Sequence, residues 1–177
     1  VFGMGTIGLI SSQILKKLGA GKIVGIDTNK VRLEQVKKTG LIDTIDRSDK
    51  NWLEQVREIC GEKGADLVVE ATGVPVVLQD AFQAVRPGGT IVVGSVYHGS
   101  ISQFEPLPIM RKELTIVGSK GPAPSVKTDG KSVVVDVLEA LQEDLKKIIT
   151  VYEYKDGVKA FEDIASGAVI KPVITFK

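Results

Sequence analysis

The stretch Gly3-Met4-Gly5-Thr6-Ile7-Gly8 has the G-x-G-x-x-G spacing of a turn that joins a strand to a helix. In such a turn the first glycine permits the tight bend, the second lets the backbone approach a pyrophosphate, and the third lets helix and strand pack closely. The helix start supplies unpaired N–H groups and a partial positive charge to phosphates. Because glycine turns are common, the rest of the sequence must decide what this one does.

Helical and strand patterns alternate after this turn. Apolar residues at three- and four-residue steps, from Ile7 through Ile10 and Ile14 to Leu18, predict an amphipathic helix over Thr6 to Leu18. Short apolar runs predict buried strands, and further helical patterns separate them. The runs are Ile23 to Ile26, Thr44-Ile45, Leu67 to Val69, Ile91 to Val93 and Leu114 to Val117, and the helices follow Asn29, Asn51 and Val74. This alternation predicts an α/β fold, a doubly wound parallel sheet of Rossmann type.

The alternation stops after Gly118. We expect a loop over Lys120 to Pro124, a helix over Lys131 to Lys146, and then an extended segment, a short helix and a final extended run. Residues 1–119 are therefore predicted to form the Rossmann domain, with its first strand truncated. Residues 120–177 are predicted to form a C-terminal segment of different organisation.

Composition excludes several classes of protein. The 177 residues are 43% hydrophobic, enough for one sizeable core, and 23 basic residues are scattered among 22 acidic ones, which does not predict nucleic-acid binding. No apolar stretch approaches the roughly 18 to 20 residues of a membrane helix, and no signal peptide is seen. Cys60 is the only cysteine, so we expect no disulfide and a cytoplasmic setting. Only two residues precede Gly3, so the sequence reads as part of a longer protein.

Asp27 gives the glycine turn a more specific meaning. It ends the second predicted strand, 19 residues after Gly8, where its carboxylate can accept hydrogen bonds from an adenosine ribose. The same charge would repel a 2′-phosphate, which favours NAD over NADP. Arg32, one helical turn later, is the counterargument, because a cation there can also bind a phosphate. A role for Asp27 in capping the next helix is compatible with either cofactor.

Five motifs, in this order, resemble the zinc-dependent medium-chain dehydrogenase/reductase family, which includes alcohol, sorbitol and threonine dehydrogenases. The resemblance covers essentially the whole chain and corresponds to the family's coenzyme domain plus its C-terminal return to the catalytic domain. The motifs are Val1 to Leu9, Val24 to Asp27, Asp66 to Gly73, Arg86 to Gly89, and Ala160-Phe161 with Lys171 to Ile174.

The resemblance implies a set of cofactor-binding residues and a homodimer formed through the edge strand Leu114 to Val117. An apolar edge strand would otherwise be exposed, which independently favours pairing. The implied set is Gly3, Gly5, Gly8 and Lys171 at the pyrophosphate with Thr6 at the helix start, Asp27 and Arg32 at the adenosine ribose, Thr72 beside the adenine, and Ile7, Val93 and Ile116 near the nicotinamide.

The resemblance also places the family's catalytic zinc in an N-terminal domain. A zinc site with an open position needs about three protein ligands, and this sequence has one cysteine and one histidine. We therefore expect neither a metal nor a catalytic residue here. His98 is expected to be a solvated loop residue, with general acid–base chemistry as the alternative. Cys60 and Glu70 are expected to be structural.

The implied function is hydride transfer between NAD and an alcohol, polyol or hydroxy-amino acid, performed by the longer protein and not by this chain alone. A noncatalytic NAD-sensing or NAD-binding module is an alternative, since the same fold serves both. A less favoured alternative is an S-adenosylmethionine methyltransferase, which also joins a glycine loop to an acidic residue at the end of its second strand.

Overall fold

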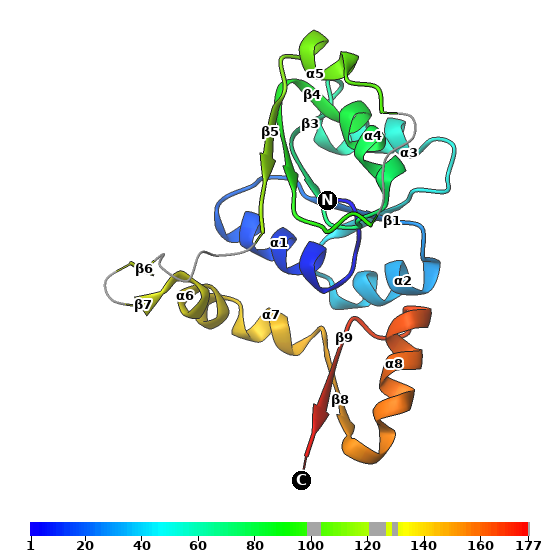
Figure 1. The fold of residues 1–177 in the computed structure, drawn as a ribbon, viewed down its shortest axis with the longest axis vertical. Helices are drawn as coiled ribbons and strands as arrows, with labels where there is room; N and C mark the ends of the chain where they lie inside the picture. The colour runs from blue at the N-terminus through cyan, green and yellow to red at the C-terminus, as the bar shows by residue number, and fades with distance from the viewer. Residues whose placement is uncertain (99–103, 121–126, 129–130, 177) are drawn as a thin grey trace.

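The computed structural model describes residues 1–98, 104–120, 127–128 and 131–176. Strands and helices alternate through its first part, and a smaller unit follows (Figure 1). The elements are α1 Thr6–Lys17, β1 Val24–Asp27, α2 Lys30–Thr39, β2 Asp43–Asp46, α3 Trp52–Cys60, β3 Ala65–Glu70, α4 Pro75–Ala84, β4 Val85–Val93, α5 Leu107–Arg111, β5 Thr115–Gly118, β6 Lys127–Thr128, β7 Lys131–Ser132, α6 Val133–Ala140, α7 Gln142–Lys146, β8 Ile149–Glu153, α8 Gly157–Ser166 and β9 Lys171–Thr175.

The main sheet is parallel throughout and runs in the order β2, β1, Phe2, β3, β4, β5. β1 pairs with β2, and β3 pairs with β4, which pairs with β5. Phe2 joins the two halves, because it forms parallel bridges to Ile26 in β1 and to Glu70 in β3. The backbone confirms this, since Phe2 N donates to Val69 O (2.8 Å) and Gly3 N donates to Ile26 O (2.7 Å). The doubly wound fold class is therefore confirmed.

Helices cover both faces of this sheet. Val24 and Ile26 of β1 belong to a cluster with residues of α3 and α4, including Val56 and Phe82. Gly25, which lies between them and therefore points to the other face, has Met4 against it, in a second cluster with residues of α1 and α2. Each face of the sheet thus has its own hydrophobic core.

Local sequence signals set several helix boundaries. The Asn29 side chain accepts a hydrogen bond from Arg32 N (3.0 Å) and so caps the start of α2, and Gly40, in the left-handed conformation, follows its last residue. The ammonium of Lys112 donates to Phe82 O (2.7 Å) and Val85 O (2.8 Å) and so satisfies carbonyls at the end of α4.

No helix among the described residues is long and apolar enough to cross a membrane.

The buried face of α1 differs from the predicted one. The buried residues are Gly8, Leu9, Ser12 and Gln13, whereas Ile7 and Leu18 are 59% and 78% exposed. The close approach of Gly8 to the turn explains the difference, since it fixes how the helix is rotated against the sheet. Helix periodicity shows which residues share a face, but not which face meets the sheet.

Other differences are in the C-terminal half. The predicted helix over Lys131 to Lys146 is two helices, α6 and α7, which Leu141 separates, and it begins only at Val133. β4 begins at Val85, six residues before the apolar run Ile91 to Val93 that predicted it, and Leu107–Arg111 form the short helix α5 before the last predicted strand. Of the predicted loop over Lys120 to Pro124, residues 121–124 lie outside the described residues.

The last part of the C-terminal segment, made of β8, β9 and α8, forms a small unit below the main sheet (Figure 1). β8 and β9 are parallel, with Ile149 opposite Lys171. Ile148 and Ile170, at the start of these two strands, are buried in the same cluster as Met4 and Leu9. This packing attaches the unit to the α1 and α2 side of the sheet, next to the glycine turn.

Candidate functional site

A cleft of about 470 Å³ lies at the carboxyl edge of the main sheet. Carboxyl edges of parallel strands are where ligands bind in doubly wound folds. The cleft brings together five of the predicted site residues with polar and valine side chains that the sequence did not single out. Its lining includes Gly3, Gly5, Asp27, Arg32 and Thr72, joined by Arg47, Ser48, Val74, Val76, Val77 and Asp80.

The glycines of the turn have different surroundings. Gly3 has a φ of +89°, which L side chains rarely adopt. A methyl group at Gly8 would lie 1.8 Å from the carbonyl oxygen of Gly3, so helix and turn touch there. A methyl group at Gly5 would meet no atom within 4 Å, although Gly5 directly precedes α1. The space at the helix start is therefore open beside Gly5 and closed beside Gly8.

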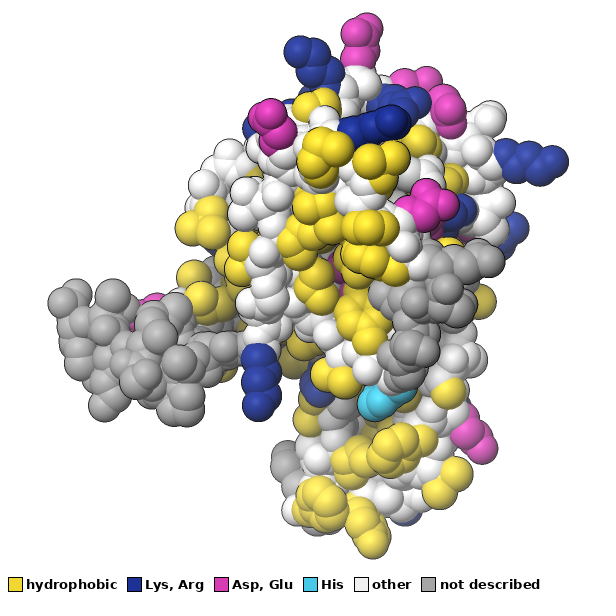
Figure 2. Space-filling model, turned by 45° about the horizontal axis from the view of Figure 1, so that its top comes forward, with side chains coloured by type: hydrophobic (Ala, Val, Ile, Leu, Met, Phe, Trp, Pro, Cys, Tyr) yellow, Lys and Arg dark blue, Asp and Glu magenta, His cyan; other side chains and the backbone are white. Residues whose placement is uncertain are grey.

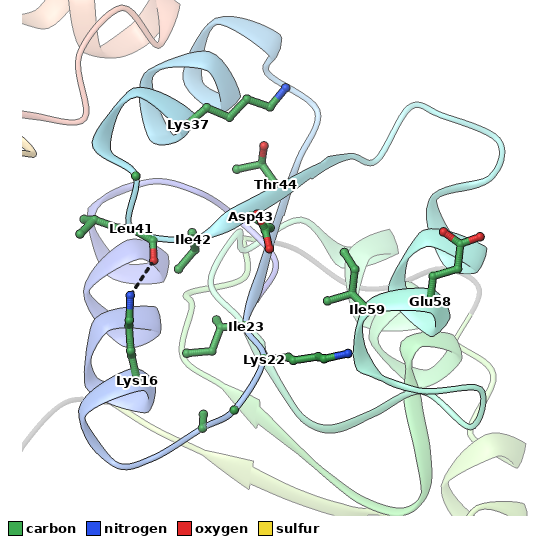
Figure 3. A pocket seen from close by; sticks show the side chains of 13 residues that line it. Lys16, Lys22, Ile23, Lys37, Leu41, Ile42, Asp43, Thr44, Glu58 and Ile59 are labelled. Carbon is green, nitrogen blue, oxygen red and sulfur yellow. Dashed lines mark hydrogen bonds between the residues drawn. The ribbon is translucent and has the colours of Figure 1, made fainter.

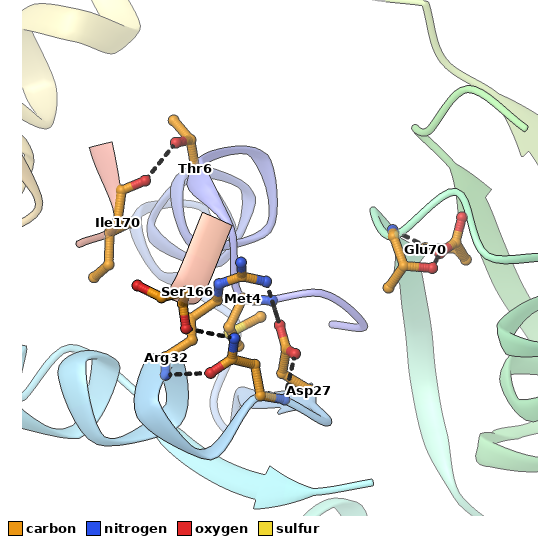
Figure 4. Close-up of polar contacts among 9 residues, drawn as sticks. Met4, Thr6, Asp27, Arg32, Glu70, Ser166 and Ile170 are labelled. Atoms are coloured by element: carbon orange, nitrogen blue, oxygen red, sulfur yellow. Dashed lines mark hydrogen bonds and ion pairs between the residues drawn. The ribbon is translucent and has the colours of Figure 1, made fainter. Parts of the chain in front are cut away.

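Asp27 ties the turn to the end of β1 (Figure 4). Its Oδ2 accepts hydrogen bonds from Met4 N (2.8 Å) and Arg32 Nη1 (3.3 Å), and its Oδ1 accepts one from Asn29 N (2.9 Å). The side chains of Asp27 and Arg32 are 9% and 25% exposed. An ionised carboxylate has about four acceptor positions, so Oδ1 retains one for a further donor. Asp27 thus both orders the turn and keeps acceptor capacity at the cleft.

Arg47 is a cleft residue that sequence reasoning missed. Its Nε and Nη2 donate to the two carboxylate oxygens of Asp80 at 2.7 and 2.6 Å, and this bond raises the pKa of Arg47 above its ordinary value. The available signal was its position directly after β2, at the carboxyl edge of the sheet. The apolar pattern of β2 was too weak to give that position weight.

A buried carboxylate lies beneath the predicted adenine residue Thr72. Glu70 is fully buried at the end of β3 and accepts hydrogen bonds from Thr72 N (2.7 Å) and from the hydroxyls of Thr72, Ser95 and Tyr97. Burial raises the pKa of Glu70, but these hydrogen bonds outweigh it and hold the pKa below its ordinary value. Burial and the bond to Glu70 raise the pKa of Tyr97. Glu70 therefore joins the segments that follow β3 and β4, which is the expected structural role.

The lowered pKa of Glu70 predicts acid sensitivity. Above the ordinary carboxyl value of 4.5 its ionised form stabilises the fold, and this contribution is lost as the pH falls through the folded-state pKa. Replacing Glu70 with glutamine should therefore make the free energy of unfolding depend less on pH between about pH 6 and pH 3. Urea unfolding across this range measures it. Glu62→Gln, at an exposed position, is the control, and an unchanged pH dependence in Glu70→Gln would contradict the prediction.

Three residues were predicted near a nicotinamide. Ile7 lies in the first turn of α1 with its side chain 59% exposed, and the other two lie at different positions along their strands. Val93 ends β4 and pairs with Gly118, and its carbonyl accepts a hydrogen bond from Ser119 N (2.8 Å). Ile116 pairs with Ile91 and so lies two positions before that edge. Its side chain is 40% exposed. The sheet register therefore brings Val93 to the carboxyl edge and leaves Ile116 short of it.

The C-terminal unit reaches the start of α1. Thr6 Oγ1 donates to Ile170 O (3.2 Å), and Asn29 Nδ2 donates to Ser166 O (3.0 Å) (Figure 4). Lys171, the residue after Ile170, begins β9, and its backbone N donates to Ile148 O (3.0 Å). The first contact is at the start of α1 and the second at the start of α2, and the predicted residue Lys171 is brought close to the turn.

A larger hollow, of about 940 Å³, lies at the opposite edge of the sheet (Figure 3). Lys16, Lys22 and Lys37 line it together with Asp43 and Glu58, so its charges are mixed, and Lys16 Nζ donates to Leu41 O (3.4 Å). None of the predicted site residues lies there. The carboxyl-edge cleft remains the candidate site.

The sequence singled out two further side chains, His98 and Cys60, outside the cleft. His98 is exposed, as expected of a solvated loop residue, and Cys60 is a partly buried free thiol whose pKa burial raises. Within the part of the chain that the structure describes, no three His, Cys, Asp or Glu side chains come together in a group that could hold a metal ion. The described residues therefore do not fit a zinc ion.

The sheet order, the two helical layers and the carboxyl-edge cleft define a Rossmann-type α/β domain. Residues 6–139 match the family model described as zinc-binding dehydrogenase. The chain therefore belongs to the zinc-binding dehydrogenase family and corresponds to the coenzyme-binding portion of its members.

The chain is also similar to known proteins over nearly its whole length. D-xylulose reductase A from Aspergillus niger is 30% identical over 98% of this chain and 49% of its own length. The structure of 2R,3R-butanediol dehydrogenase from Bacillus subtilis is similar with a TM-score of 0.79 at 24% identity, covering 99% of this chain and 50% of the other. A short chain alcohol dehydrogenase from E. coli CFT073, complexed with NADH, gives 0.75 at 24% identity over 99% and 51%. The chain spans about half the length of the curated relatives it matches.

Proposed function

We propose that this chain is the coenzyme-binding part of an NAD-dependent oxidoreductase that transfers a hydride between NAD and an alcohol or polyol carbon. The observation that carries the proposal is the cleft itself. It places the open side of Gly5, at the start of α1, next to the carboxylate of Asp27 at the end of β1. This combination suits a dinucleotide, whose pyrophosphate takes the helix start and whose adenosine ribose takes the carboxylate.

The residues of the turn fit this cofactor. The first N–H groups of α1 have no partner within the helix, so they are free to donate to phosphate oxygens beside Gly5. The free acceptor position on Asp27 suits a ribose hydroxyl, and the ion pair with Arg32 leaves that cation less available to a 2′-phosphate. Lys171, held near Thr6 by the C-terminal unit, would add a cation at the pyrophosphate. These contacts support NAD as the cofactor, with Thr72 lining the adenine side of the cleft.

The substrate class rests on the relatives. By their names, one relative reduces D-xylulose, a polyhydroxy ketone, and one structural neighbour is a dehydrogenase of butanediol, a diol. These names support an alcohol or polyol as the substrate, and the family resemblance adds a hydroxy-amino acid to the proposed class. Because the described residues do not fit a zinc ion, the zinc of this family is proposed to bind in a part of the protein beyond this chain.

We propose that the chain divides between residues 119 and 120. Residues 1–119 would form the cofactor domain, and residues 120–177 would return toward a catalytic domain. Support comes from exposed apolar side chains of the C-terminal unit, which gather on its surface (Figure 2). They are Val151, Tyr154, Val158, Phe161 and Phe176.

A homodimer is proposed through β5. This strand is exposed along its length, and Ile116 and Val117 are 40% and 45% exposed on it. An unpaired apolar edge strand is a template for pairing with a second copy.

We also propose a cytoplasmic setting for the protein, which suits the free thiol of Cys60.

Fluorescence of NADH tests the proposed function. Adding the chain to NADH should raise nicotinamide emission on excitation of Trp52, the only tryptophan, through energy transfer. In the same cuvette, NAD with zinc and a panel of alcohols should give no turnover, because the catalytic part is proposed to lie elsewhere. Absence of an NADH signal would contradict cofactor binding. Turnover at the rate of a complete dehydrogenase would contradict the proposal that the catalytic part lies outside this chain.

A further inference from the structure

Arg47 is held by two neighbours on two of its sides. Asp80, on α4, accepts hydrogen bonds from Nε and Nη2 of the guanidinium, and its side chain is only 5% exposed. The Arg47 guanidinium carbon lies 4.5 Å from the centre of the Trp52 ring, and Trp52 is itself 5% exposed. A guanidinium fixed in this way by a bidentate carboxylate and an aromatic ring has little rotational freedom left.

The Arg47 side chain also lines the cleft. It is 30% exposed, and both Arg47 and Asp80 line the 470 Å³ cavity. Its backbone N donates to the carbonyl of Asp27 (2.8 Å), so Arg47 is fixed next to the proposed ribose site. The same cavity has apolar lining from Val74, Val76 and Val77. The planar Arg47 cation and the valine side chains thus line one cavity, beside the Asp27 carboxylate proposed to bind the ribose.

We infer that Arg47 is the stacking surface for the adenine base, with Trp52 behind it and Asp80 fixing its plane. Planar guanidinium groups stack on π-systems, and every base presents a π-face. Asp80 also neutralises the charge of Arg47, so the contact would favour a neutral base over a phosphate. The inference rests on the proposed dinucleotide function and assigns its adenine contact to a residue outside the family resemblance.

Packing around Trp52 explains why the Arg47 guanidinium is held rigidly. Trp52 packs against Phe2 with ring centres 5.8 Å apart at 73°. Phe2 precedes the glycine turn and bridges β1 and β3. The guanidinium is therefore supported by a series of ring contacts, face-on to Trp52 and then edge-on to Phe2, that leads back to the turn and fixes the base and pyrophosphate sites to one another.

The inference is tested by comparing the affinities of the chain for NAD and for nicotinamide mononucleotide, which has no adenine. Each affinity is measured by displacement of bound NADH. Arg47→Leu combined with Asp80→Leu removes both charges and leaves neither buried alone. It should weaken NAD binding about tenfold, the effect of losing one base stack, and leave the mononucleotide unchanged. Arg57→Leu, on an exposed position of α3, removes the same charge away from the cleft and is the control. A merely structural role for Arg47 would weaken both ligands alike.

Arg47→Lys is the second variant and keeps the test decisive if the double variant does not fold. Lysine preserves the charge beside Asp80 but lacks the planar group, so NAD binding should still weaken severalfold relative to the mononucleotide. Unchanged NAD affinity in a folded variant, or an equal loss for both ligands, would overturn the inference and leave the proposed function intact. If the unmodified chain does not bind NAD, the proposed function fails first.

Discussion

Replacing Gly8 with alanine is expected to destabilise the domain by about 3 kcal/mol or more and to abolish dinucleotide binding. The added methyl group would lie 1.8 Å from Gly3 O and 3.0 Å from Gly3 C, both backbone atoms that cannot rotate away. The helix would have to leave the turn, and Leu9 and Ser12, which are buried beside Gly8, would move with it. Urea unfolding followed by circular dichroism measures the change.

Gly5→Ala is the matched control, because it adds the same methyl group to the same turn. Gly5 has a φ of −76° and no atom within 4 Å of the added position, so its stability should change by less than about 0.5 kcal/mol. Its affinity for NAD should nevertheless fall, because the methyl group would occupy the space proposed for the pyrophosphate. Equal stability of the two variants would contradict the packing role assigned to Gly8.

Replacing Asp27 with serine is expected to raise the affinity for NADP relative to NAD by at least about tenfold. The change removes the negative charge that opposes a 2′-phosphate and releases Arg32 from its 3.3 Å contact. It also removes an acceptor of Met4 N, so some loss of stability should accompany it. Calorimetric titration with each dinucleotide measures the ratio.

Asp66→Ser is the control for this change. Asp66 lies near the start of β3, at the other edge of the sheet, and its side chain is 82% exposed in an ion pair with Arg86. Its removal should leave the ratio of the two affinities unchanged. A preference of the unmodified chain for NADP would show that the interpretation of Asp27 is wrong.

Much of the fold was predictable because its signals are local. Asn29 and Gly40 delimit α2, Pro75 begins α4, and short apolar runs mark β1 and β3. Parallel pairing followed from strands and helices that alternate with short connections. What periodicity did not reveal was the rotation of α1, because the contact between Gly8 and Gly3 O depends on a turn whose geometry is set by distant strands.

The candidate site was predictable only where a motif marked it. The turn and Asp27 carry a recognisable spacing, and the cleft does bring them together. The pair of Arg47 and Asp80 is separated by 33 positions, and the contact of Thr6 with Ile170 by 164, so neither leaves a local pattern. Such contacts arise from the order of strands in the sheet and from the return of the C-terminal unit.

Calorimetric titration of the chain with NAD and, separately, with S-adenosylmethionine tests the central claim that the carboxyl-edge cleft is a dinucleotide site. Both ligands contain adenosine, but only NAD has a pyrophosphate for the start of α1. We expect saturable binding of NAD, weakened in Gly5→Ala, and no binding of S-adenosylmethionine at the same concentrations. Preferential binding of S-adenosylmethionine, or an NAD affinity that Gly5→Ala does not alter, would contradict the account.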